Sequence, residues 1–133
     1  MLGQAVAEAP AGAGSPRRVD KPWGHEIWFA VSERYAGKVL HIQAGHELSL
    51  QYHVHKDETI YLLSGELALE LEDDGGRLET LALAPGECRR ILPGRRHRMR
   101  AIQDCQIFEV STPELDDVVR LEDRYGRAGT SVS

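Results

Sequence analysis

Glycine and proline recur so often through the middle of the chain that little room is left for long helices. Between residues 22 and 94 they divide the sequence into mostly short segments, a spacing that favours strands and turns. The positions are Pro22, Gly24, Gly37, Gly45, Gly65, Gly75, Gly76, Pro85, Gly86, Pro93 and Gly94. No helical period is sustained across this region. We therefore expect an all-β domain, built as a barrel or a sandwich.

The segments between these breaks alternate apolar and polar residues in the way that half-buried strands do. Leu67, Leu69 and Leu71 face one side of a predicted strand, and the glutamates between them face the other. The run Asp73–Gly76 then has the composition of a hairpin turn. Further strands are predicted over residues 26–30, 38–42, 78–83, 89–92, 97–102 and 106–111.

The ends of the chain differ from its middle. Residues 1–19 begin with a stretch rich in alanine, glycine and proline, which predicts a disordered tail, and residues 128–133 are expected to fray. One domain is expected over residues 20–127. Thr112-Pro113-Glu114 can cap a short helix that uses Leu115, Val118 and Val119, although the same residues also fit a strand.

Length and charge exclude several classes of protein. A chain of 133 residues is one ordinary domain. Its formal net charge of −5 makes it a poor candidate for binding nucleic acid. No apolar run approaches the roughly 20 residues of a membrane-spanning helix, and the N-terminus does not resemble a secretion signal. We expect a cytoplasmic protein without a membrane partner, in which Cys88 and Cys105 stay reduced.

The segment from residue 47 to residue 55 carries most of the candidate chemistry. If it is a strand, one face holds Glu47, Ser49, Gln51, His53 and His55. That face either meets water or lines a cavity inside a small barrel. In the second case, two imidazoles at positions i and i+2 are close enough to share one metal ion.

Two further residues can complete such a metal site. Glu58 follows His55 by three residues, so a turn can bring its carboxylate to the same ion, and His97 follows a glycine turn and supplies a third imidazole. Three imidazoles and one carboxylate suit Zn, Mn, Co, Fe, Ni or Cu, and leave positions open for water or substrate. Among the arginines of residues 89–100, Arg89 shares its parity with Ile91 and is the candidate for contacting an anionic substrate.

Two stretches of the chain resemble the motifs of the cupin superfamily. The first runs from Gly45 through His53-Val54-His55-Lys56-Asp57-Glu58 to Gly65, and the second runs from Gly86 to Gly94-Arg95-Arg96-His97. More closely, about residues 20–127 resemble the type II mannose-6-phosphate isomerase domain, which usually forms the C-terminus of bifunctional mannose-1-phosphate guanylyltransferases. The segments that carry this resemblance are Lys21-Pro22-Trp23-Gly24, Leu48-Ser49-Leu50-Gln51, Leu63-Ser64-Gly65 and Val119-Arg120-Leu121-Glu122-Asp123-Arg124-Tyr125-Gly126-Arg127.

The resemblance implies a double-stranded β-helix with one divalent transition metal bound by His53, His55, Glu58 and His97. It also implies a stand-alone isomerase domain that interconverts mannose 6-phosphate and fructose 6-phosphate, with a homodimer as the default assembly. The metal would stabilise an enediolate while a general base moves a proton between C1 and C2. Ser49 and Gln51 are expected to hold substrate hydroxyl groups.

The general base and the reaction itself stay open at this stage. His41, Glu47 and Lys56 are the candidates for the base. One alternative is a metal-dependent cupin dioxygenase that acts on a small molecule, because dioxygenases use the same ligand set. Another is a non-enzymatic sugar-binding or regulatory cupin. The second alternative rests on the lack of a convincing base and on Thr59, which stands where the isomerase domain often has a histidine.

Overall fold

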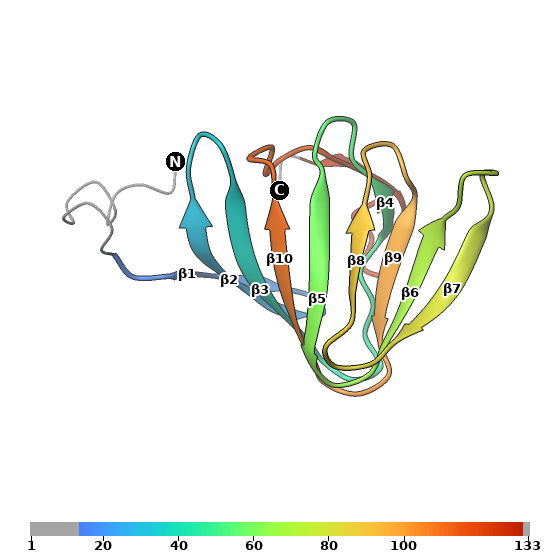
Figure 1. The fold of residues 1–133 in the computed structure, drawn as a ribbon, viewed down its shortest axis with the longest axis horizontal. Helices are drawn as coiled ribbons and strands as arrows, with labels where there is room; N and C mark the ends of the chain where they lie inside the picture. Colours follow the sequence, from blue (N-terminus) through green and yellow to red (C-terminus); the bar gives the residue numbers. More distant parts are fainter. Residues whose placement is uncertain (1–13, 132–133) are drawn as a thin grey trace.

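The computed structural model describes residues 14–131, which form two antiparallel six-stranded sheets (Figure 1). The order of strands is β1-β2-β3-β10-β5-β8 in the first sheet and β12-β11-β4-β9-β6-β7 in the second. Their bounds are β1 Arg17–Lys21, β2 Gly24–Val31, β3 Ala36–Ile42, β4 Leu50–Tyr52, β5 Glu58–Ser64, β6 Leu67–Glu72, β7 Leu78–Leu83, β8 Cys88–Ile91, β9 His97–Ala101, β10 Cys105–Ser111, β11 Val118–Glu122 and β12 Gly129–Ser131. The predicted all-β fold is confirmed.

From β3 onward the chain passes back and forth between the two sheets. Strands β3, β5, β8 and β10 lie in the first sheet, while β4, β6, β7, β9 and β11 lie in the second. This winding makes β4 and β9 neighbours although they are far apart in the sequence, with Gln51 opposite His97. The two segments that carry the candidate chemistry therefore meet in space.

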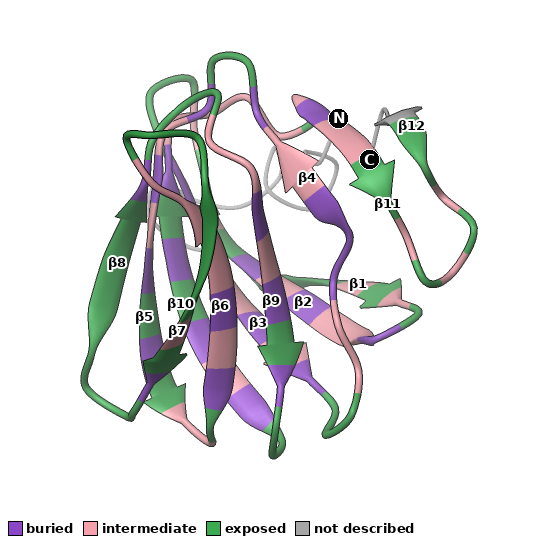
Figure 2. Cartoon of the chain, turned by 90° about the vertical axis from the view of Figure 1, so that its right-hand side faces the viewer, coloured by how far each residue is buried: buried purple, intermediate pink, exposed green. Residues whose placement is uncertain are grey.

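The inner faces of the sheets enclose one apolar core. Because side chains alternate along a strand, the central strands contribute every second residue to it. In β10, for example, Ile107 is buried and its neighbour Phe108 is exposed, and similar banding is seen along β3 and β5 (Figure 2). The core consists of Trp23, Leu40, Ile42, Leu48, Ile60, Leu62, Leu67, Leu69, Leu83, Ile91, Met99, Ala101, Cys105 and Ile107.

The predicted hairpin at Asp73–Gly76 joins β6 to β7. The Asp73 carboxylate accepts hydrogen bonds of 2.9 Å from the backbone N–H groups of Gly75 and Arg77. Gly76 has a φ of 82°, in the left-handed region that glycine adopts without a steric penalty. The hairpin is confirmed.

Of the two alternatives for the residues after Thr112, a short helix or a strand, the structure shows the strand. Val118 and Val119 lie instead in β11, where Val119 pairs with Tyr52 of β4 and Val118 pairs with Ser131 of β12. The reason is tertiary, because β4 offers a ladder of backbone partners that the local sequence does not reveal. No helix long and apolar enough to cross a membrane occurs in residues 14–131.

The predicted domain limits also differ from the structure. Strand β1 begins at Arg17 and pairs with β2, so the ordered chain starts before residue 20. At the other end, β12 pairs with β11 within the segment that was expected to fray. The rest of the two predicted tails, residues 1–13 and 132–133, lies outside the described residues.

Candidate metal centre and its pocket

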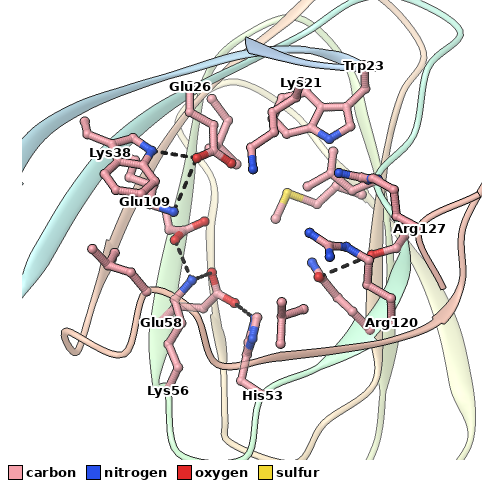
Figure 3. A pocket seen from close by; sticks show the side chains of 18 residues that line it. Lys21, Trp23, Glu26, Lys38, His53, Lys56, Glu58, Glu109, Arg120 and Arg127 are labelled. Atoms are coloured by element: carbon pink, nitrogen blue, oxygen red, sulfur yellow. Dashed lines mark hydrogen bonds and ion pairs between the residues drawn. The ribbon is translucent and has the colours of Figure 1, made fainter. Parts of the chain in front are cut away.

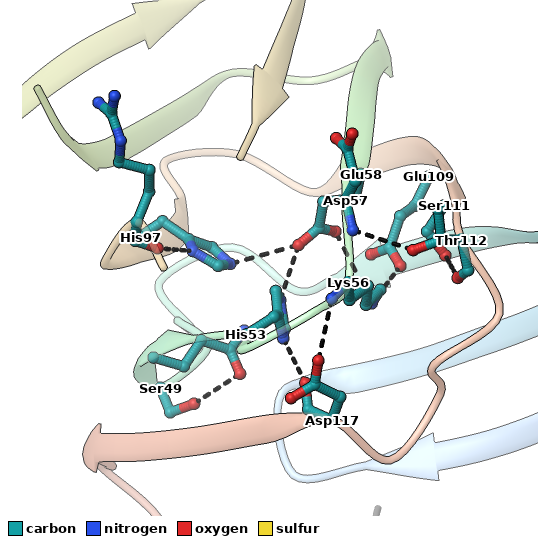
Figure 4. Close-up of polar contacts among 12 residues, drawn as sticks. Ser49, His53, Lys56, Asp57, Glu58, His97, Glu109, Ser111, Thr112 and Asp117 are labelled. Atoms are coloured by element: carbon teal, nitrogen blue, oxygen red, sulfur yellow. Dashed lines mark hydrogen bonds and ion pairs between the residues drawn. The ribbon is translucent and has the colours of Figure 1, made fainter. Parts of the chain in front are cut away.

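Three buried side chains converge between the two sheets: those of His53, Glu58 and His97 (Figure 4). The Nε2 atom of His53 lies 2.8 Å from Oε2 of Glu58, and Nε2 of His97 lies 3.5 Å from the same oxygen. One ligand atom from each residue lies within 4.8 Å of the other two. His53 follows β4, Glu58 opens β5 and His97 opens β9, so this His-Glu-His group bridges the sheets.

Both imidazoles are oriented by backbone carbonyls. Nδ1 of His53 lies 2.6 Å from the carbonyl oxygen of Asp117, and Nδ1 of His97 lies 3.0 Å from that of Arg95. A carbonyl can only accept, so each Nδ1 must carry the proton. In the neutral ring, the Nε2 lone pair then faces the Glu58 carboxylate. This arrangement is repulsive unless a cation stands between the atoms.

The geometry of the group fits a metal ion. Nε2 of His53, Oε2 of Glu58 and Nε2 of His97 are buried and have no hydrogen-bond partner within the described part of the chain. Buried polar atoms without partners are rare in folded proteins. Imidazoles that donate Nδ1–H to a carbonyl and turn Nε2 inward are the usual ligands of a transition metal. Two nitrogens and one carboxylate oxygen suit Zn, Mn, Fe or a related divalent ion.

Glu58 is in the charge state that a metal ligand requires. Burial by itself raises the pKa of Glu58, but the charge of the Lys56 ammonium opposes it, and the pKa lies well below its usual range. Nζ of Lys56 lies 3.9 Å from Oε1 of Glu58 and 2.9 Å from Oε2 of Glu109. Although burial alone lowers the pKa of Lys56, these two carboxylates raise it above its usual value. Lys56 is therefore a fixed buried cation beside the His-Glu-His group.

Asp117 fixes the loop that carries His53. Its carboxylate accepts hydrogen bonds from the backbone N–H groups of Val54, His55 and Lys56, at 3.0, 2.6 and 2.9 Å. Burial raises the pKa of Asp117, but these three amides outweigh it, and the net shift is downward. Thr112 adds to the clamp, because its Oγ1 accepts from the backbone N–H of Asp57 at 3.0 Å.

His55, the fourth predicted ligand, is exposed and lies outside the His-Glu-His group. The expectation assumed that a strand continues through residue 55. Strand β4 ends at Tyr52, and the chain bends at Val54 and His55, so alternation holds only as far as His53. Gln51, at position i−2 from His53, and Ser49 line the same pocket as His53. Oγ of Ser49 donates a hydrogen bond to Oε1 of Gln51 at 3.3 Å.

Three other predicted site residues lie away from this pocket. Arg89 is exposed, because β8 is the edge of its sheet and no strand covers it, and its Nη1 donates to the backbone oxygen of Cys88. His41 lies on the outer face of the first sheet, stacked on His25 at 4.3 Å. Glu47 forms ion pairs with Arg98 and Arg100. Of the predicted bases, Lys56 alone lines the pocket.

The pocket above the His-Glu-His group is lined by charged residues that sequence reasoning missed. Its cavity volume is about 70 Å³, and it opens to solvent on one side. One wall alternates in charge towards the metal group, and a cationic wall stands across the pocket from it (Figure 3). The alternating wall consists of Glu26, Lys38, Glu109, Lys56 and Glu58. The cationic wall consists of Arg120 and Arg127 on the opposite side, and of Lys21 at the end of the wall that lies beside Glu26.

Strand parity could have identified part of this lining. Glu26 shares a face of β2 with buried Trp28, and Glu109 shares a face of β10 with buried Ile107. A charged residue on the buried side of a strand signals either a paired charge or a functional site. No local signal marks Arg120 and Arg127, because their position depends on how β11 packs.

Replacing Asp117 tests whether it positions the metal loop. We expect Asp117→Ala to weaken binding of Zn²⁺ or Mn²⁺ about 10- to 100-fold, because the loop that carries His53 then loses the carboxylate that holds three of its amides. Titration calorimetry measures this affinity. Asp116→Ala is the matched control, since Asp116 is the exposed neighbour on the same loop. Equal affinities in the two variants would contradict the clamp.

Comparison with known proteins agrees with this fold. A family model described as mannose-6-phosphate isomerase C-terminal matches residues 12–123. The xanthan biosynthesis protein XanB of Xanthomonas campestris is 31% identical over 116 residues, which cover 84% of this chain and 24% of that protein. The mannose-1-phosphate guanylyltransferase ManC of Salmonella typhimurium is also 31% identical, over 84% of this chain and 23% of its own length. The chain thus spans about a quarter of these relatives.

Solved structures with the same fold are more distant in sequence. KdgF from Halomonas superposes with a TM-score of 0.66 at 20% identity, covering 75% of this chain and 88% of that chain. An oxalate decarboxylase variant from Bacillus subtilis superposes with a TM-score of 0.70 at 17% identity, covering 80% of this chain and 30% of that chain. These likenesses confirm the predicted cupin fold. With the family model matching most of its length, the chain belongs to the mannose-6-phosphate isomerase C-terminal family of cupins.

Proposed function

We propose that this chain is a metal-dependent isomerase that interconverts mannose 6-phosphate and fructose 6-phosphate. The observation that carries the proposal is the pairing of two features in one pocket. His53 and Glu58 of the His-Glu-His group line one side, and Arg120 and Arg127 of the cationic wall stand across from them (Figure 3). A sugar phosphate has the matching parts, with hydroxyl and carbonyl oxygens for a metal and a dianion for the cationic wall.

The cationic wall is short of negative charge. Nε of Arg120 is buried and has no hydrogen-bond partner among residues 14–131. Burial and the charge of Arg127 lower the pKa of Arg120. Burial also lowers the pKa of Lys21. The charge of Glu26 opposes this shift, and the positive charges of Lys38, Arg120 and Arg127 add to it. Arg127 is held in place by Asp123, through hydrogen bonds of 2.9 and 3.1 Å. A bound phosphate would neutralise this wall and accept from the free N–H groups.

His53, Glu58 and His97 would hold the metal, with the side-chain oxygen of Gln51 as a fourth ligand. When bound, a divalent metal supplies Lewis acidity that stabilises the negative charge of an enediolate. The rest of the ligand sphere would stay open to the substrate. In this assignment Gln51 takes the ligand role that the resemblance gave to His55, and Ser49 positions the Gln51 amide by donating to its oxygen.

We assign the proton transfer between C1 and C2 to Glu26. Its Oε1 accepts from the indole N–H of Trp28 at 2.7 Å and lies 3.3 Å from Nζ of Lys38. Burial raises the pKa of Glu26, but Lys38, Lys21 and Trp28 outweigh it, and the net shift is downward. Glu26 is therefore an ionised carboxylate that faces the pocket at neutral pH, as a general base must be. Lys56 is tied to two carboxylates and is a poorer base.

The metal content of two variants tests whether His53 or His55 is a metal ligand. We expect His53→Ala to lose more than about 100-fold in affinity for Zn²⁺ or Mn²⁺, a larger loss than an outer-shell partner causes. His55→Ala should bind like the wild type, because His55 is exposed. Elemental analysis after dialysis, together with the rise in melting temperature on adding metal, measures both. Loss of metal in His55→Ala would restore the ligand set that the resemblance implied.

The cationic wall is tested by steady-state kinetics of the metal-loaded protein. We expect Arg120→Met to raise KM for mannose 6-phosphate about 10- to 100-fold, the range for losing a hydrogen bond to a charged group. Arg34→Met, at an exposed position outside the pocket, should leave KM unchanged. Wild-type protein with tightly bound metal but no turnover of either sugar phosphate would contradict the proposal. Oxygen uptake with small-molecule substrates would then point to the dioxygenase alternative.

Glu26 is tested by the isosteric change Glu26→Gln. The amide still accepts from Trp28 but cannot take a proton, so kcat should fall by at least about 100-fold with little change in KM. Exchange of the substrate C2 proton with D₂O, followed by NMR, should be lost in parallel. Unchanged exchange in a folded, metal-loaded Glu26→Gln protein would assign the base elsewhere.

A further inference from the structure

Strands β11 and β12 form a hairpin at the edge of the second sheet, where β4 is the neighbour that joins it to the other strands (Figure 2). Strand β4 is three residues long, and its ladder with β11 is irregular between Arg120 and Glu122. Edge elements with few backbone pairs open at a lower free energy than the centre of a sheet does. The edge hairpin, as we call residues 117–131, can therefore open while the core stays folded.

The edge hairpin carries residues of both parts of the candidate site. Asp117, at its start, accepts hydrogen bonds from three amides of the loop after β4, and its carbonyl oxygen orients the His53 ring. Further along, Arg120 and Arg127 line the pocket as the main part of the cationic wall. Lys21 is the member of that wall which lies outside the hairpin. Docking of this one element therefore fixes the metal loop and assembles most of the wall.

A row of residues across three strands connects the cationic wall to the His-Glu-His group by a second route. Register places Arg120 of β11 opposite Gln51 of β4, and Gln51 opposite His97 of β9. Directly opposite residues on neighbouring strands share a face of the sheet and lie close enough for their side chains to interact. Any shift of β11 relative to β4 therefore moves Arg120 with respect to Gln51 and the metal group.

Both parts of the site oppose docking of the hairpin unless a ligand is bound. Because Asp117 fixes the tautomer of His53, the Nε2 lone pair of His53 faces the Glu58 carboxylate, whose Oε2 lies 2.8 Å away. In the wall, burial and the charge of Arg127 lower the pKa of Arg120, whose buried Nε has no partner in the described part of the chain. A divalent cation removes the first conflict and a phosphate dianion removes the second. Either ligand alone thus stabilises the docked hairpin.

We propose that the edge hairpin couples the two parts of the site, so that a bound metal ion raises the affinity for phosphate and bound phosphate raises the affinity for the metal. Both ligands bind the docked hairpin more tightly than the open one, which shifts the population towards the docked form. The two effects are equal in size, because coupling between binding sites is reciprocal. The proposal rests on the proposed function, since it takes the cationic wall as the place where phosphate binds. It does not require turnover of a sugar phosphate.

Titration calorimetry of the full chain with inorganic phosphate, without Zn²⁺ and at saturating Zn²⁺, measures the coupling. We expect Zn²⁺ to tighten phosphate binding at least about 5-fold, the lower end of the usual range for coupled sites. In Asp117→Ala this tightening should be lost apart from the direct attraction between the metal and the anion, because the metal loop then no longer holds the hairpin. Asp116→Ala, at the exposed neighbouring position, is the matched control and should keep the wild-type factor.

A second variant loosens the hairpin without touching either ligand. Oη of Tyr125 lies 2.7 Å from Nδ1 of His46, a contact that fastens the turn between β11 and β12 to the loop before β4. Tyr125→Phe removes this hydrogen bond and keeps the ring, so the open hairpin becomes more populated. Phosphate should then bind the metal-free protein about 2- to 10-fold more weakly and the zinc-saturated protein as in the wild type. Tyr35→Phe, at an exposed position between β2 and β3, should change neither affinity.

Amide hydrogen exchange reports on the hairpin directly. Zn²⁺ alone and phosphate alone should each slow exchange in β11, because each ligand favours the docked form. Exchange in β7, at the opposite edge of the same sheet, should not change. If Asp117→Ala does not fold, these measurements and Tyr125→Phe carry the test.

Three results would count against the proposal in different ways. Equal phosphate affinity of the wild type with and without Zn²⁺ would overturn the coupling and leave the proposed function standing. A full wild-type factor in Asp117→Ala would assign the coupling to direct attraction and overturn the role of the hairpin. A zinc-loaded wild type that binds no phosphate would contradict the proposed function together with this inference.

Discussion

The hold of Asp117 on residues 53–56 is the contact on which the candidate site depends. Where β4 ends, the chain bends, and the amides of the bend have no strand to pair with. The Asp117 carboxylate accepts hydrogen bonds from three of these amides, while the backbone carbonyl of Asp117 orients His53. Asp117 directly precedes β11, whose pairing with β4 brings it to the loop. The sheet pairing, the loop and the His-Glu-His group therefore form one mechanical unit.

The pocket concentrates charge that a folded protein normally keeps at its surface. Burying charged groups costs free energy that paired geometry only partly offsets. The alternating wall, from Glu26 through Lys38, Glu109 and Lys56 to Glu58, keeps each charge beside an opposite one. The cationic wall is balanced only in part, because Arg127 pairs with Asp123 while Arg120 keeps an unpartnered Nε within the described chain. This asymmetry is what a phosphate group would satisfy, and it is why we connect the pocket with a sugar phosphate.

Sequence reasoning succeeded where a local rule governs the structure. Alternation identified the strands and their buried sides, because the period of two is a property of the extended backbone itself. The hairpin at Asp73–Gly76 followed from turn chemistry in the same way. The same reasoning failed at His55 and did not decide between helix and strand near Val118, because in both places a distant strand or the end of one decides the conformation. The prediction that Arg89 faces the pocket was wrong for a related reason, since the alternation of side chains cannot tell an edge strand such as β8 from a central one.

The sequence alone thus determined the all-β class and the faces of most strands, and it pointed to His53, Glu58 and His97, which the structure brings together. These follow from short-range periodicity and from residue chemistry. The tertiary structure decided that Gln51 rather than His55 lines the pocket with His53, and that Arg120 and Arg127 stand across from Glu26. The physical reason is that residues from both ends of the chain become neighbours only through strand pairing, such as that of β11 with β4, which no local pattern encodes.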